Sequence, residues 1–151
     1  MSIATVSIDR SSLPGTLSPL LVTDDDATYR LTLDGLGEPG YTWRERLMPD
    51  SADVHGSELV AAVLERTSLP LEVIVMASSS AALKTAMTAL RDAVWQFSYP
   101  VTVTVDGQSE TWAGCGPAAW ALSNSKVDHS HVAQFFRVVT IVIPLYDPIA
   151  S

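Results

Sequence analysis

The chain has 151 residues and a formal net charge of −8, from 17 Asp and Glu against 9 Lys and Arg. This length fits a single domain, which we take as residues 1–151. Its one cysteine, Cys115, excludes an internal disulfide framework and a multi-cysteine zinc site. The acidic balance argues against a nucleic-acid-binding face, because such a face needs clustered Lys and Arg.

The chain carries few charges for its apolar content. Charged residues make up 17% and apolar residues 47%, whereas globular domains average about 25% charged residues. This shortage of charge indicates buried subunit interfaces. Residues 1–23 lack a basic start followed by an apolar core, and no apolar run approaches about 20 residues. We therefore expect neither a secretory signal nor insertion into a membrane.

The first third of the chain predicts short strands and loops. Residues 1–26 read as a first strand followed by an arm rich in Ser, Pro and Gly, and residues 29–33 alternate apolar and polar as a half-buried strand does. Residues 35–56 contain four glycines and two prolines, which predicts a long loop, interrupted at most by a short strand at 41–47. A loop of about 20 residues in a compact domain tends to be functional.

The middle of the chain contains one clear helix, over residues 79–97. Its apolar residues follow a 4-3-4-3 spacing that forms one stripe: Leu83, Met87, Leu90, Val94 and Phe97. A serine at 78, 79 or 80 can cap the exposed amides at its start. Residues 71–77 form a short run that is rich in β-branched side chains, which is typical of a strand. Residues 57–66 fit a helix and a strand equally well.

The last third predicts strands. Residues 101–106 alternate closely, Asp106-Gly107 marks a tight turn, and residues 110–113 pair back on them. A short strand is expected at 118–122. Residues 132–145 are apolar on both faces, which predicts a strand covered by its own core on one side and by something else on the other. The whole pattern predicts a mainly β (α+β) fold, a β-sandwich with one flanking helix.

Few residues form a pattern that could support catalysis or bind a metal. His129 and His131 lie close together beside Asp128, and the one other histidine is His55. Closed metal sites need three or four placed ligands, so a polar loop is the favoured interpretation, and a small ligand- or metal-binding module remains an alternative. Cys115, between two glycines, resembles an exposed thiol without a neighbouring base. We expect no enzyme activity, no cofactor and no metal.

Aromatic and basic residues occur together in the long loop. Trp43 lies beside Arg44 and close to Arg46, a composition typical of an interface anchor. With Tyr41, these residues are the predicted assembly contacts in the loop. The two-faced strand supplies a second predicted set of contacts: Phe135, Arg137, Val139 and Ile141.

The order of these elements resembles that of the tail proteins of long-tailed phages, most closely the distal or minor tail proteins of siphophages infecting actinobacteria. The resemblance covers roughly residues 54–148 and rests on short motifs and their order. These are Val54-His55-Gly56-Ser57, residues 58–66, residues 69–77, the helix at 79–97, residues 99–106 and the closing Ile143-Pro144-Leu145-Tyr146-Asp147-Pro148.

This resemblance implies a tail-tube-like fold repeated around a ring, with a long loop reaching a neighbour and residues 57–66 forming a strand. We expect a ring of six copies at the tail tip, made in the host cytoplasm and contacting the tail tube, the tape measure and the baseplate hub. DNA would pass through without specific binding, along acids that repel phosphate. The candidate channel acids are Asp24, Asp25, Asp26, Asp106 and Glu110. A tail-terminator or head–tail connector ring is the alternative.

Overall fold

The computed structural model describes residues 4–26, 28–37, 39, 43–48, 58–64, 67–122 and 135–147. Ten strands and one helix follow one another along this part of the chain. They are β1 (Ala4–Ile8), β2 (Leu20–Thr23), β3 (Tyr29–Leu36), β4 (Trp43–Met48), β5 (Glu58–Leu64), β6 (Thr67–Met76), α1 (Ser80–Val94), β7 (Tyr99–Val105), β8 (Gln108–Cys115), β9 (Ala119–Leu122) and β10 (Phe136–Leu145). The prediction of a mainly β chain is confirmed.

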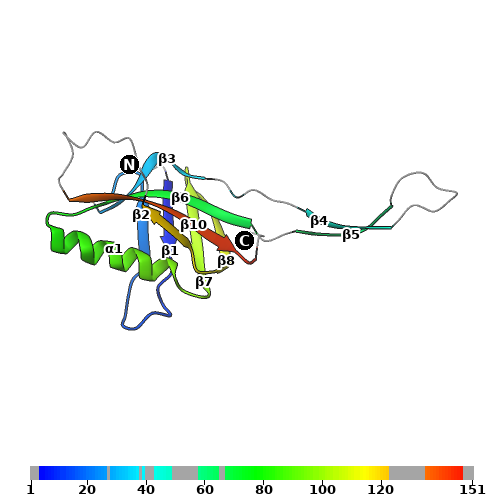
Figure 1. Ribbon diagram of the computed structural model, residues 1–151, viewed down its shortest axis with the longest axis horizontal. Coiled ribbons are helices and arrows are strands. Elements are labelled where there is room, and N and C mark those ends of the chain that lie inside the picture. Colours follow the sequence, from blue (N-terminus) through cyan, green and yellow to red (C-terminus); the bar gives the residue numbers. More distant parts are fainter. Residues whose placement is uncertain are drawn as a thin grey trace.

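Eight strands form one sheet that closes on itself. The strand order is β6-β3-β2-β1-β7-β8-β10-β9, and β6 also pairs with β10. That antiparallel pairing runs the full ten residues of each strand, from Phe136 opposite Met76 to Leu145 opposite Thr67. The expected β-sandwich is thus corrected to a barrel-like sheet, because the last strand returns to pair with β6 (Figure 1).

The core lies inside this sheet. From Leu69 in β6 and from Val139 in β10, every second residue is buried, as the period of two in a strand requires. Val73 and Val139 face each other across the ladder in this way, and both are fully buried. Val6 and Ile8 of β1 join the same apolar cluster.

Helix α1 packs one apolar stripe onto this core. The Ser79 hydroxyl accepts a hydrogen bond from the Ala82 N–H at 3.1 Å, which confirms a serine cap. Leu83, Leu90 and Val94 are buried, as the spacing predicted. The inclusion of Phe97 in the stripe was wrong, because the helix ends at Val94 and the Phe97 side chain is 88% exposed.

The turn between β7 and β8 has the predicted two-residue form. Asp106 and Gly107 have φ values of 49° and 79°, the left-handed conformation that a type I′ hairpin turn requires at both positions. Glycine takes that conformation without steric cost. Thr102 lies opposite Thr111 across this hairpin, and their hydroxyl oxygens are 2.9 Å apart.

Strands β4 and β5 form a separate two-stranded antiparallel sheet, in which Trp43 lies opposite Leu64. Figure 1 shows this hairpin projecting away from the barrel. Residues 58–64 are therefore a strand, as the phage resemblance implied. β3 continues to Leu36, just past the expected start of the long loop at residue 35, and β4 lies where a short strand within that loop was anticipated.

Candidate assembly surfaces

The contact residues predicted in and just before β10 are not all exposed at the surface. Val139 and Ile141 are fully buried in the core cluster, opposite Val73 and Leu71 of β6. Their assignment as subunit contacts is corrected, because the chain's own core accounts for their burial. Arg137 is exposed, and its guanidinium donates a hydrogen bond of 2.8 Å to the Phe136 carbonyl.

Phe135 lies just before β10 and is partly buried. Its side chain packs against the core cluster, and its carbonyl accepts a hydrogen bond from the Ala77 N–H at 2.9 Å. This bond joins the start of β10 to the segment that leads from β6 into α1. Phe135 therefore supports the chain's own fold, and Arg137 is the one exposed residue of the four predicted contacts in this region.

The predicted contacts of the long loop fall on the projecting hairpin. Trp43, Arg44 and Arg46 belong to β4 and pair with Leu64, Val63 and Ala61 of β5. Tyr41 lies outside the described residues. The structure therefore places three of the four loop residues on a strand that extends away from the barrel (Figure 1).

The candidate channel acids come together at one end of the sheet. The Asp24 N–H donates a hydrogen bond of 3.3 Å to the carbonyl of Ala4, and Ala4 pairs with Val105 at the end of β7. Asp106 follows Val105 directly, and Glu110 is exposed at the start of β8. Segments about 80 residues apart in sequence thus contribute acids to one rim.

Two of these acids also hold the loop between β2 and β3. The Asp26 carboxylate accepts hydrogen bonds from the main-chain N–H groups of Thr28, at 3.2 Å, and Tyr29, at 2.9 Å. The Asp25 carboxylate lies 3.1 Å from the Thr23 hydroxyl, which donates to it. The sequence signalled only a solvated acidic run, and this capping role was missed.

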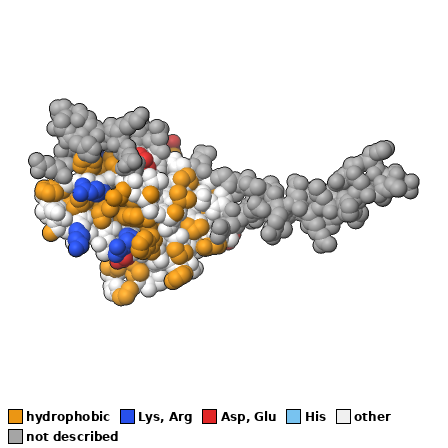
Figure 2. Space-filling model, in the orientation of Figure 1, with side chains coloured by type: hydrophobic (Ala, Val, Ile, Leu, Met, Phe, Trp, Pro, Cys, Tyr) orange, Lys and Arg blue, Asp and Glu red, His pale blue; other side chains and the backbone are white. Residues whose placement is uncertain are grey.

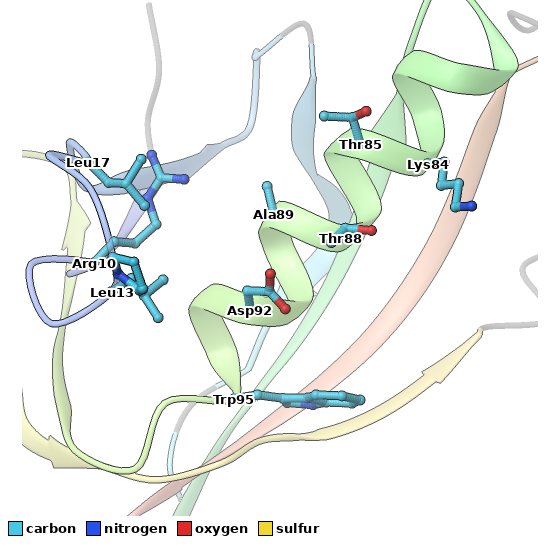
Figure 3. Close-up of a pocket in the computed structure, with 10 residues that line it drawn as sticks. Arg10, Leu13, Leu17, Lys84, Thr85, Thr88, Ala89, Asp92 and Trp95 are labelled. Atoms are coloured by element: carbon cyan, nitrogen blue, oxygen red, sulfur yellow. The ribbon is translucent and has the colours of Figure 1, made fainter.

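A groove of about 680 Å³ runs between the N-terminal arm and α1 (Figure 3). Leu13 and Leu17 of the arm lie on one side of it, Ala89 of α1 points toward them, and Trp95 lines it at the C-terminal end of the helix. The charged side chains along it are Arg10, Lys84 and Asp92. Sequence reasoning did not find this groove, because the arm carried no pattern that placed it on the helix.

Gln96 fixes the arm beside the helix. Its amide nitrogen donates hydrogen bonds of 2.7 Å to the carbonyls of Asp9 and Ala93, and its amide oxygen accepts one of 2.6 Å from the Ser12 hydroxyl. Gln96 is only 7% exposed, so its side chain is largely shielded from water. They connect the arm to the end of α1.

Several large apolar side chains remain exposed on the barrel. Figure 2 shows hydrophobic groups spread over the face that carries α1, interrupted by basic groups. Trp95 is 47% exposed, and the Arg91 guanidinium lies 5.1 Å from its ring centre, a cation–π distance. Leu122, in β9, is 61% exposed.

The cysteine and the histidines add no chemical site in the described residues. Cys115 is fully buried in β8, so the expectation of an exposed thiol was wrong. Burial raises its pKa to about 12, which keeps the thiol neutral and unreactive. His55, His129 and His131 lie outside the described residues. Within the described part of the chain, no three His, Cys, Asp or Glu residues gather as metal ligands.

No helix in the described residues is both long and apolar enough to cross a membrane. The sequence matches no family model and no curated protein.

Solved structures with this fold include proteins of two phages and of the anti-feeding prophage baseplate. The Dit protein of phage SPP1, described as a paradigm of the hub adsorption apparatus in phages infecting Gram-positive bacteria, matches with a TM-score of 0.51 and 18% identity. That match covers 82% of this chain and 51% of the Dit chain. A chain of the phage P2 baseplate, in its activated conformation with calcium, matches with a TM-score of 0.55 and 9% identity over 95% of this chain and 43% of its own.

The baseplate of the anti-feeding prophage supplies a third match. One of its chains has a TM-score of 0.50 and 13% identity, over 95% of this chain and 88% of its own. The present chain spans about half the length of the SPP1 protein and less than half of the P2 chain. All identities are low, so the likeness concerns the fold. This chain has the fold of phage distal tail and baseplate hub proteins.

Proposed function

We propose that this protein is a structural component of a long-tailed phage, a distal or minor tail protein that forms a ring at the tail tip and surrounds the DNA channel. The observation that carries this proposal is the shared fold with hub and baseplate chains from three different particles. The same likeness favours the tail tip over a tail-terminator or head–tail connector position. The protein's role is assembly and not catalysis.

The projecting hairpin supports self-association. An isolated two-stranded hairpin is marginally stable in water and needs a further surface to pack on. β4 and β5 pair only with each other among the described residues. In a ring of identical subunits each copy uses one surface to contact a different surface on the next, and the ring closes when the rotation does. A hairpin that leaves the barrel can provide one of these two surfaces.

The acidic rim supports a channel that passes DNA. Asp24, Asp106 and Glu110 lie at one end of the sheet, in a chain of net charge −8. Negative charge on a channel wall repels phosphate and keeps DNA from adhering. We place this rim toward the channel, with the tail tube, the tape measure and the baseplate hub as neighbouring partners.

The solution mass tests the ring directly. Light scattering across a concentration series should give a discrete species near six times the mass of one chain, visible as rings by negative-stain electron microscopy. Trp43→Ala should shift this species toward the monomer. Phe97→Ala, which removes an aromatic side chain that is 88% exposed on the barrel, is the control and should leave the ring intact. A monomer at every concentration would overturn the ring.

A further inference from the structure

Strand β9 leaves one edge free in the body of the protein. It pairs with β10 from Ala119 opposite Val142 to Leu122 opposite Val139, and no second strand pairs with it among the described residues. Its sequence, Ala-Trp-Ala-Leu, contains no charge and no proline. Natural edge strands are protected from pairing by shortness, charges, prolines or bulges. β9 is short, with four residues, but it has neither a charge nor a proline, so these four residues can still pair with another strand.

Strand β5 has the second free edge of this kind. It pairs with β4 alone among the described residues. The β4 sequence, Trp-Arg-Glu-Arg-Leu-Met, carries three charges, which is typical of a protected edge. The β5 sequence is uncharged and apolar after Glu58: Leu-Val-Ala-Ala-Val-Leu. The outer edge of β5 therefore has the same unprotected character as that of β9.

The two edges belong to different parts of the molecule. β9 is part of the barrel-like sheet, whereas β5 lies on the hairpin that projects from it (Figure 1). A strand from a second copy can bring them together. We propose that β5 of one copy adds as a strand to the free edge of β9 in the next copy. This assignment rests on the proposed ring and names its contact.

Strand addition suits the chemistry of both edges. Main-chain hydrogen bonds between the added strand and the sheet provide the affinity in such complexes. Each chain has a net charge of −8, so two copies repel each other overall. β9 and the last six residues of β5 carry no charge, and a contact there avoids placing like charges together. Because the two surfaces differ, each copy gives one strand and receives another.

Cysteine cross-linking tests the contact itself. One protein carries Ala119→Cys or Ala121→Cys, a second carries Ala61→Cys or Ala62→Cys, and each pair is mixed and oxidised. At least one of the four mixtures should give a covalent dimer of the two variants. The native thiol stays out of the reaction, because Cys115 is fully buried. In the control mixture, Ala81→Cys, at an exposed helix position, takes the place of the β9 variant, and no covalent dimer should form.

A charge on the edge strand tests its part in the ring. Leu122→Lys places a cation on β9 at a side chain that is already 61% exposed, and it should reduce the ring at least tenfold in favour of the monomer. Leu21→Lys is the matched control, since Leu21 is 50% exposed on β2, which lies between β1 and β3. It should leave the ring intact.

The outcomes separate this contact from the proposed function. A ring that survives Leu122→Lys, or one that yields no cross-link between β9 and β5 in any mixture, overturns the contact and leaves the ring standing. Wild-type protein that is monomeric throughout, without any cross-link, overturns both. Loss of the ring in Leu122→Lys alone, together with a cross-link, supports the contact.

Discussion

The phenolic oxygen of Tyr99 lies 3.0 Å from the carbonyl oxygen of Gly116, seventeen residues further along the chain. It lies equally close to the carbonyl oxygen of Val94, in the last turn of α1. Tyr99 is 2% exposed, so its hydroxyl joins the end of the helix to the end of β8 inside the core.

Tyr99→Phe should lower the free energy of unfolding by about 1–3 kcal/mol, because it removes the one buried hydroxyl that the Gly116 and Val94 carbonyls share, and only the Ala118 N–H remains as a donor to Val94. Urea denaturation measures this change. Tyr29→Phe removes the same atom from a half-buried site, where the hydroxyl donates to the Ala86 carbonyl at 2.8 Å. That variant should lose less stability. Equal losses would contradict the central role given to the Tyr99 hydroxyl.

Ser79→Ala should destabilise the protein by about 1 kcal/mol, the usual cost of removing a helix cap. The lost interaction is the hydrogen bond from the Ala82 N–H to the Ser79 hydroxyl. Thermal unfolding followed by circular dichroism provides the measurement. Ser78→Ala, at the neighbouring exposed position, should have little effect, and a comparable drop there would argue against the assigned cap.

Stability should fall as the pH rises above about 9. Burial raises the pKa of Cys115 from an ordinary value of 9.0 to about 12, so the unfolded chain loses this proton at lower pH than the folded chain does. The raised pKa of buried Tyr99 acts in the same direction. Urea denaturation at pH 8 and pH 10 should show a smaller fall for Cys115→Ala than for wild type. Identical falls would show that the thiol does not contribute.

Gln96→Ala should release the N-terminal arm from α1. The substitution removes the hydrogen bonds to Asp9, Ala93 and Ser12. Hydrogen exchange of the arm amides over residues 10–18 should become faster, while exchange in β6 should stay unchanged. Ser98→Ala, at an exposed position that does not line the groove, is the control. Unchanged exchange in the arm of the Gln96 variant would show that other contacts hold it.

Local sequence patterns correctly predicted the elements that depend only on residues close together in the sequence. The alternation in β7 and the Asp106-Gly107 pair predicted that hairpin, and the serine cap marked the start of the helix. The predicted end at residue 97 was too late; it relied on Tyr99-Pro100, since proline disfavours a helical conformation in the residue before it. The helix ends at Val94, where the Trp95 N–H still donates to the Arg91 carbonyl.

Contacts between distant segments could not be predicted in this way. Closure of the sheet depends on pairing β6 with β10, whose residues lie about 70 positions apart. This closure places Val139 and Ile141 in the core, whereas the two-faced apolar pattern suggested a neighbouring subunit. The start of β6 was also predicted too late, at residue 71, because a proline in a strand indicates a boundary. In the structure Pro70 lies within β6, opposite Val142 of β10.

The β4–β5 hairpin leaves and rejoins the barrel at neighbouring points. Leu36 pairs with Leu71, and the Gly37 N–H donates to the Pro70 carbonyl at 3.0 Å, where a side chain on Gly37 would collide with the Pro70 ring. The chain between these points is an insertion whose ends are already held together by the barrel. Doubling the length of such a loop costs only about 0.6 kcal/mol in closure entropy. The reach of the hairpin can therefore change during evolution while the barrel stays the same.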